Sequence, residues 1–105
     1  MEYDGPRLKG KAAEFAAVLR DHLPDLRERY GVESLGIFGS YLRKEERSES
    51  DLDVLVEFAR TPDLLQFVDL KPALSHLLDV DVDLVMKRAL KPRIGKRILA
   101  EVVQV

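Results

Sequence analysis

The eight residues from Asp51 to Phe58 alternate between two kinds of side chain, and this alternation restricts what the chain can fold into. Every second residue is apolar: Leu52, Val54, Val56 and Phe58. The residues between them are mostly acidic: Asp51, Asp53, Leu55 and Glu57. Side chains of a β-strand point alternately to the two faces of a sheet, so the pattern predicts a strand with one face in a core. Such a strand needs neighbours to pair with and helices to cover its apolar side.

A second alternating stretch at residues 79–85 predicts another half-buried strand. Its apolar face carries Val80, Val82 and Leu84. Its other face carries Asp79, Asp81, Asp83 and Val85. If the two strands are neighbours in one sheet, the carboxylates of Asp51 and Asp53 converge with one or two of the later ones. Carboxylates that lie so close repel one another and need a counterion, which a divalent cation supplies.

Helical periodicity and breaker residues predict the N-terminal elements. We expect an amphipathic helix over residues 7–23, which Pro24 would end or restart as a second helix running to Tyr30. A short buried strand is expected from Ser34 to Phe38, ending in Gly39–Ser40.

The same signals predict two helices after the acidic strand. Thr61 is expected to cap a helix with Pro62 at its first position, and Pro72 to kink or split that helix. Pro92 opens the last helix, whose apolar side is expected to be Ile94, Ile98, Val102 and Val105. The order helix, strand, strand, helix, strand, helix predicts an α/β (α+β) fold, a small mixed sheet with helices on one face.

The composition favours one domain with a hydrophobic core and no disulfide bonds. We expect a single domain over residues 1–105, because this length supports one modest core. No apolar run is long enough to span a membrane and no signal-like stretch opens the chain, so a cytoplasmic location is expected. The sequence has no cysteine, so a metal would be held by oxygen or imidazole, which favours Mg²⁺ or Mn²⁺ over structural zinc.

Acidic and basic residues are segregated along the chain. Residues 45–57 contain six acids and one arginine, whereas residues 87–97 contain six basic residues and no acid. The basic stretch is the candidate for a partner surface or for a contact with a triphosphate, with a solvated helix end as the plainer alternative. The net charge of −2 and the lack of an aromatic stacking platform argue against nucleic acid as the main partner.

The candidate chemistry depends on the spacing between a glycine–serine pair and two aspartates. Gly39 and Ser40 end the first expected strand, and ten residues separate them from Asp51-x-Asp53. Glycine lets the backbone come close to a ligand, while the serine hydroxyl and free N–H groups can bind phosphate oxygens. Metal-binding carboxylates beside such a turn fit phosphoryl or nucleotidyl transfer from a nucleoside triphosphate.

At these residues the chain resembles the minimal nucleotidyltransferases of the DNA polymerase β-like superfamily. The resemblance covers Gly39–Glu45, Ser50–Val56 and Val82–Val85, and it extends over most of the chain. It implies that Asp51 and Asp53 bind metal, that Asp83 binds metal or helps to deprotonate the acceptor hydroxyl, and that Gly39 and Ser40 hold the triphosphate. Asp81 shares a face with Asp83 and is the rival for the third carboxylate. The chain departs from the family pattern at Lys44 and Asp79, where relatives usually or often have glycine.

The resemblance also implies a partner. Minimal nucleotidyltransferases of this kind are often antitoxins of HEPN ribonucleases and are thought to transfer AMP from ATP to a toxin tyrosine. The expected function is therefore metal-dependent AMP transfer to a HEPN-type toxin. The alternative is a non-catalytic antitoxin that neutralises its partner by binding alone. A chain this small provides at most half of a cleft, so association with the partner, or with a second copy as a homo-oligomer, is expected.

Overall fold

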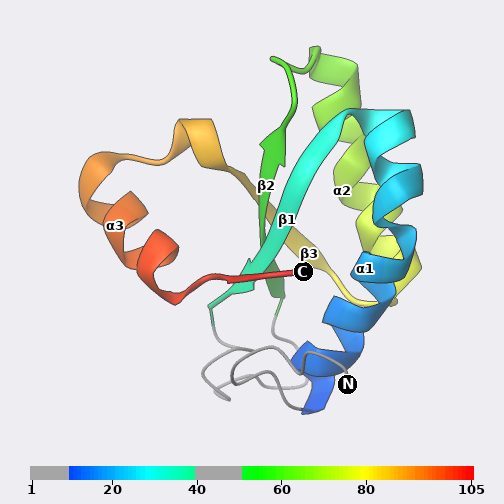
Figure 1. Cartoon of the computed structure of the whole chain (residues 1–105), viewed down its shortest axis with the longest axis horizontal. Coiled ribbons are helices and arrows are strands. Elements are labelled where there is room, and N and C mark those ends of the chain that lie inside the picture. Colours follow the sequence, from blue (N-terminus) through cyan, green and yellow to red (C-terminus); the bar gives the residue numbers. More distant parts are fainter. Residues whose placement is uncertain (1–9, 40–50) are drawn as a thin grey trace.

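The structure is a computed structural model that describes residues 10–39 and 51–105 (Figure 1). Its elements are α1 (Gly10–Tyr30), β1 (Val32–Phe38), β2 (Leu52–Phe58), α2 (Leu64–Leu78), β3 (Val82–Met86), the 3₁₀ turn η1 (Lys87–Ala89), α3 (Pro92–Glu101) and β4 (Val103–Gln104). The predicted order of helices and strands is confirmed, with η1 and β4 in addition. None of the described helices is both long and apolar enough to cross a membrane.

The four strands form one mixed sheet in the order β3-β2-β1-β4. β1 runs antiparallel to both of its neighbours, β2 and β4, whereas β2 and β3 are parallel. The parallel pair requires a crossover connection, and α2 provides it. The predicted fold class is confirmed, and the two alternating strands are direct neighbours.

Helices α1 and α2 lie side by side on one face of the sheet and bury its apolar side chains (Figure 1). The apolar set of β2 is buried there as expected, with Leu52, Val54 and Val56 fully inaccessible to solvent. Burial of such side chains is the main source of stability in a domain of this size. α3 lies toward the other side of the sheet (Figure 1), so the expected placement of the helices on one face holds for α1 and α2 but not for α3. Ile94, on the expected apolar side of α3, remains 58% exposed.

Neither of the two internal prolines divides its helix, which corrects the expectation that Pro24 ends or restarts the first helix and that Pro72 splits the next. Each proline removes one backbone hydrogen bond. Buried leucines lie close to both prolines: Leu23 and Leu26 in α1, and Leu70 and Leu74 in α2. Packing of these leucines against the sheet outweighs the local cost of the prolines.

The ends of α2 also differ from expectation. Asp63, rather than Thr61, is the N-cap: its Oδ1 accepts from the Gln66 N–H at 2.8 Å, and the Gln66 side chain accepts from the Asp63 N–H. Asp79 does not begin the next strand. It caps α2 in the left-handed conformation with φ 56°, a geometry that glycine adopts most easily.

Candidate active site

Two of the predicted aspartates lie opposite each other on neighbouring strands. In the parallel register of β2 and β3, Asp53 pairs with Asp83. The residue pairs before and after them, Leu52 with Val82 and Val54 with Leu84, are buried beneath the helices. Because side chains alternate along a strand, Asp53 and Asp83 both point to the opposite face of the sheet, which α1 and α2 do not cover and which we call the open face.

Asp51 and Asp81 each lie two residues before a member of this pair. The Leu52 N–H donates to the Asp81 carbonyl oxygen at 2.8 Å, so the two strands are already joined where the acidic residues begin. Asp51 is exposed and lies two residues before Asp53, which places it toward the same open face. The register thus gives Asp83 a direct partner in Asp53, whereas Asp81 precedes the first residue of β3.

Gly39 lies against the Asp53 carboxyl group. Gly39 follows Phe38, the register partner of Asp53, and has φ 88°, which L side chains rarely adopt. A Cβ atom at this position would lie 2.8 Å from the Asp53 Cγ and 3.1 Å from its Cβ, and would overlap the carboxylate. Both the backbone conformation and the available space therefore require glycine. Ser40, the other predicted triphosphate residue, lies outside the described residues, as does Lys44.

The structure adds Glu101 to this site. The Gly39 N–H donates to Glu101 Oε2 at 3.1 Å, and Glu101 is the last residue of α3. Sequence reasoning missed this residue because 62 positions separate it from Gly39. One signal was present: Glu101 is the only acidic residue after Asp83 in the sequence.

Gly36 is a second residue that the sequence did not single out. A Cβ atom there would lie 2.6 Å from Val102 Cγ2 and 3.3 Å from the Val103 carbonyl oxygen. The C-terminal segment therefore packs directly on the β1 backbone. Leu55, the register partner of Gly36, is 3% exposed although it points to the same face as the aspartates. The open face is thus covered near the middle of β2 and remains exposed at Asp83.

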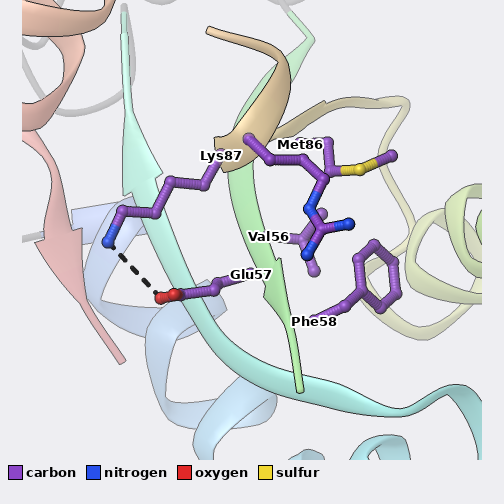
Figure 2. A pocket seen from close by; sticks show the side chains of 6 residues that line it. Val56, Glu57, Phe58, Met86 and Lys87 are labelled. Carbon is purple, nitrogen blue, oxygen red and sulfur yellow. Dashed lines mark hydrogen bonds and ion pairs between the residues drawn. The ribbon is translucent and has the colours of Figure 1, made fainter. Parts of the chain in front are cut away.

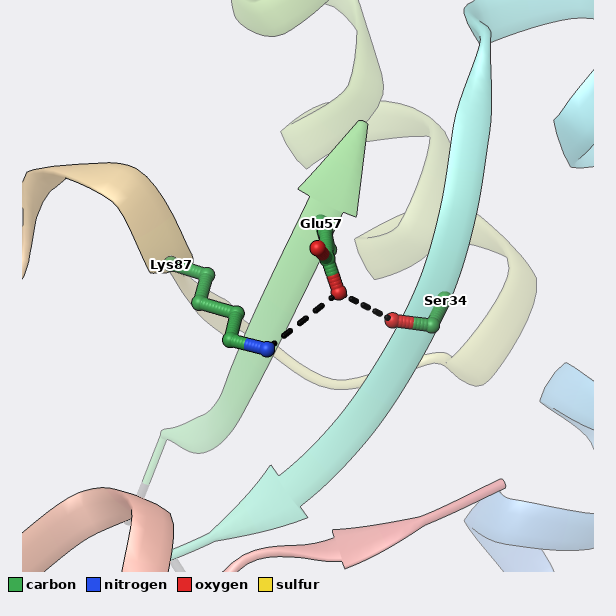
Figure 3. Close-up of polar contacts among 3 residues, drawn as sticks. All are labelled: Ser34, Glu57 and Lys87. Atoms are coloured by element: carbon green, nitrogen blue, oxygen red, sulfur yellow. Dashed lines mark hydrogen bonds and ion pairs between the residues drawn. The ribbon is translucent and has the colours of Figure 1, made fainter. Parts of the chain in front are cut away.

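Basic residues lie at the opposite end of the sheet from the aspartates. Glu57 Oε1 accepts from the Ser34 hydroxyl and from Lys87 Nζ, each at 3.4 Å (Figure 3). Beside this cluster is a cavity of about 320 Å³ lined by Val56, Glu57, Phe58, Met86, Lys87 and Arg88 (Figure 2). Arg88 donates to the Thr61 hydroxyl at 2.6 Å. Lys87 and Arg88 are therefore engaged at the far end of β2, away from Asp53.

The donor set at the acidic end suits a hard cation. Asp51, Asp53 and Asp83 offer only carboxylate oxygens, the ligands that Mg²⁺ and Mn²⁺ prefer. As placed, the side chains of residues 10–39 and 51–105 form no group of three or more His, Asp or Glu that would hold a metal ion. The backbone register nonetheless brings Asp53 and Asp83 to adjacent strands, which lie about 4.8 Å apart.

Comparison with known proteins places this geometry in a family. A family model for the nucleotidyltransferase domain matches residues 19–105 of the chain. The chain belongs to the nucleotidyltransferase domain family. It is therefore a nucleotidyltransferase, an enzyme that moves a nucleotide from one molecule to another, as the glycine–serine pair and the aspartates had indicated.

Relatives of this nucleotidyltransferase act on proteins or occur with toxins. The protein adenylyltransferase MntA of Thermococcus cleftensis is 49% identical over 92 residues, which cover 88% of this chain and 93% of the relative. A solved structure described as a minimal nucleotidyltransferase has a TM-score of 0.74 at 39% identity and covers 88% of this chain and 94% of that one. A structure of the tri-AMPylated HEPN toxin of Shewanella oneidensis in complex with MNT antitoxin gives a TM-score of 0.56 at 28% identity, over 87% of this chain and 65% of that one.

Proposed function

We propose that this nucleotidyltransferase is an antitoxin that transfers AMP from ATP to a tyrosine hydroxyl of a HEPN-type toxin, with Mg²⁺ or Mn²⁺ in its site. The observation that carries the proposal is the register of Asp53 with Asp83 on the open face, with Gly39 against the Asp53 carboxylate. The similarity to a protein adenylyltransferase over nearly the whole chain supports a protein as the acceptor. The similarity to the antitoxin in a complex with an AMPylated HEPN toxin supports the class of partner.

In this proposal the three aspartates, Gly39 and Ser40 form one site. Asp51, Asp53 and Asp83 would hold the metal, which supplies positive charge against the triphosphate. AMP transfer forms a bond from the acceptor oxygen to the α-phosphorus and breaks the bond from that phosphorus to the pyrophosphate. The proton of the acceptor hydroxyl must leave, and Asp83 is the candidate to take it. Gly39 leaves room for the Asp53 carboxylate, and the Ser40 hydroxyl would donate to a phosphate oxygen.

The proposed partner surface is α3. Its apolar residues Ile94 and Leu99 are 58% and 46% exposed, although large apolar side chains on a helix are normally covered. Basic residues surround them: Lys91, Arg93, Lys96 and Arg97. A toxin with an acidic and apolar patch would fit this face, and its tyrosine would then approach the open side of the sheet.

The decisive experiment mixes the purified chain with a co-encoded HEPN protein, ATP and Mg²⁺ and follows the mass of the partner. We expect the partner to gain the mass of AMP on a tyrosine and to lose ribonuclease activity, since a bulky anion there blocks its site. Asp53→Asn should abolish the mass gain. Asp69→Asn, a matched change of an exposed aspartate on α2, should leave it unchanged.

The same variants test the non-catalytic alternative. An antitoxin that acts by contact alone would neutralise its partner equally well as wild type and as Asp53→Asn, with no AMP on the partner. That result would replace the proposal of AMP transfer with one of simple binding.

A further inference from the structure

The end of α3 reaches the end of β1 through one side chain. Glu101 Oε2 accepts from the Gly39 N–H at 3.1 Å. Glu101 is partly buried, and β4 begins two residues later, at Val103. The contact therefore joins the C-terminal segment to the turn beside the proposed nucleotide site.

The contact continues the pairing of β1 with β4. The Val105 N–H donates to the Leu35 carbonyl oxygen at 3.0 Å in this antiparallel pair. Hydrogen-bonded pairs of an antiparallel ladder recur at every second residue, and the same register brings Gly39 opposite Glu101. Glu101 still belongs to α3, so its carboxylate takes the place of the strand carbonyl that would otherwise accept from Gly39.

Gly39 consequently lies between two carboxyl groups. On the β2 side, a Cβ atom at Gly39 would be 2.8 Å from the Asp53 Cγ. On the β4 side, Glu101 accepts its N–H. A glycine at φ 88° has many other conformations open to it, so a hydrogen bond that holds this one restricts the backbone at Gly39.

We propose that Glu101 is a positioning residue of the nucleotide site, which holds Gly39 in the conformation that leaves room for the Asp53 carboxylate. Because Glu101 engages the Gly39 N–H, Gly39 acts on nucleotide binding through the position of the Asp53 carboxylate beside it, and phosphate oxygens are bound by other groups. This inference rests on the proposed nucleotide site.

Two substitutions separate the hydrogen bond from the charge. Glu101→Gln keeps an acceptor oxygen at the same position on the side chain and removes the negative charge. Glu101→Ala removes both. Ser34→Ala is the matched control, because it removes one side-chain hydrogen bond, to Glu57, from the same strand five residues before Gly39.

The experiment has one readout that needs no nucleotide and two that do. Hydrogen exchange of the Gly39 amide, followed by NMR in the absence of ATP, measures whether Glu101 protects it. Calorimetry measures the Kd of Mg²⁺·ATP, and steady-state kinetics of AMP transfer separate KM from kcat. In Glu101→Ala we expect lost protection at Gly39 and roughly tenfold weaker binding, the loss of one hydrogen bond. KM for ATP should rise more than kcat falls, and Glu101→Gln and Ser34→Ala should stay close to wild type.

Each of the following results would overturn the inference. Unchanged Gly39 protection in Glu101→Ala would show that the contact does not hold the turn. Equal losses in Glu101→Gln and Glu101→Ala would assign the effect to charge, and equal losses in Ser34→Ala would assign it to general loosening of β1. Failure of the proposed function is distinguishable, because wild type itself would then bind no Mg²⁺·ATP and transfer no AMP, and the positioning role would fall with it. Wild-type binding that Glu101→Ala leaves unchanged rejects the positioning role alone.

Discussion

Gly39→Ala is expected to abolish nucleotide transfer while the protein stays folded, because the added methyl group would overlap the Asp53 carboxylate. Two effects of this substitution lower the free energy of unfolding. Holding alanine at φ 88° costs about 1–2 kcal/mol, and turning Asp53 out of its rotamer costs about 0.5–1.5 kcal/mol. The sum, about 1.5–3.5 kcal/mol, is less than the usual stability of a domain, about 5–15 kcal/mol. Activity should fall at least about hundredfold, since a displacement of about 1 Å in a catalytic site has that effect.

Gly31→Ala provides the matched control. Gly31 also has a positive φ, 71°, but the nearest atom to an added Cβ is Gln66 Nε2 at 3.9 Å, so this variant carries the conformational cost without the overlap. Urea unfolding measures both stabilities, and transfer of labelled AMP measures both activities. Gly31→Ala should lose about 1–2 kcal/mol, the conformational cost alone, and keep its activity. The reasoning is refuted if Gly39→Ala is as stable as Gly31→Ala and still transfers AMP.

Three further changes test the third carboxylate, the helix cap and the partner surface. Asp83→Asn should lower kcat at least about hundredfold, as the loss of a proton acceptor does. Asp81→Asn should change kcat only a few fold. If Asp81→Asn instead caused the larger loss of kcat, Asp81 would be the third carboxylate. Asp63→Ala should lower the unfolding free energy by about 1 kcal/mol in urea titrations and leave transfer intact, because it removes only the cap of α2. Charge reversal at Lys96 and Arg97 should weaken binding of the HEPN partner, most strongly at low salt, as measured by calorimetry; unchanged affinity would exclude α3 as the partner surface.

Local patterns were enough to predict the acidic end of the sheet. The alternation in β2 depends only on the two-residue period of a strand, so the burial of Leu52, Val54 and Val56 could be predicted without knowledge of the rest of the fold. The pairing of Asp53 with Asp83 required one further assumption, that the two alternating strands are neighbours, and the structure confirms it.

Features that depend on packing could not be predicted in this way. Pro24 has the local signature of a helix end, but buried Leu23 and Leu26 keep α1 continuous through it. Glu101 carries no motif, and only the fold brings it to Gly39. The roles of the aspartates as metal ligands remain predictions, as does the role of Ser40, which lies outside the described residues.

The bond from Gly39 to Glu101 also has a consequence for the order in which the protein folds. Its two residues are 62 positions apart, so a long stretch of chain must be ordered before they meet. During synthesis the helices α1 and α2 can begin to pack on β1 and β2 while α3 is still inside the ribosome. The turn beside Asp53 acquires its second support only after residue 101 has emerged. A nascent chain can thus bury much of its hydrophobic core before Gly39 and Glu101 meet.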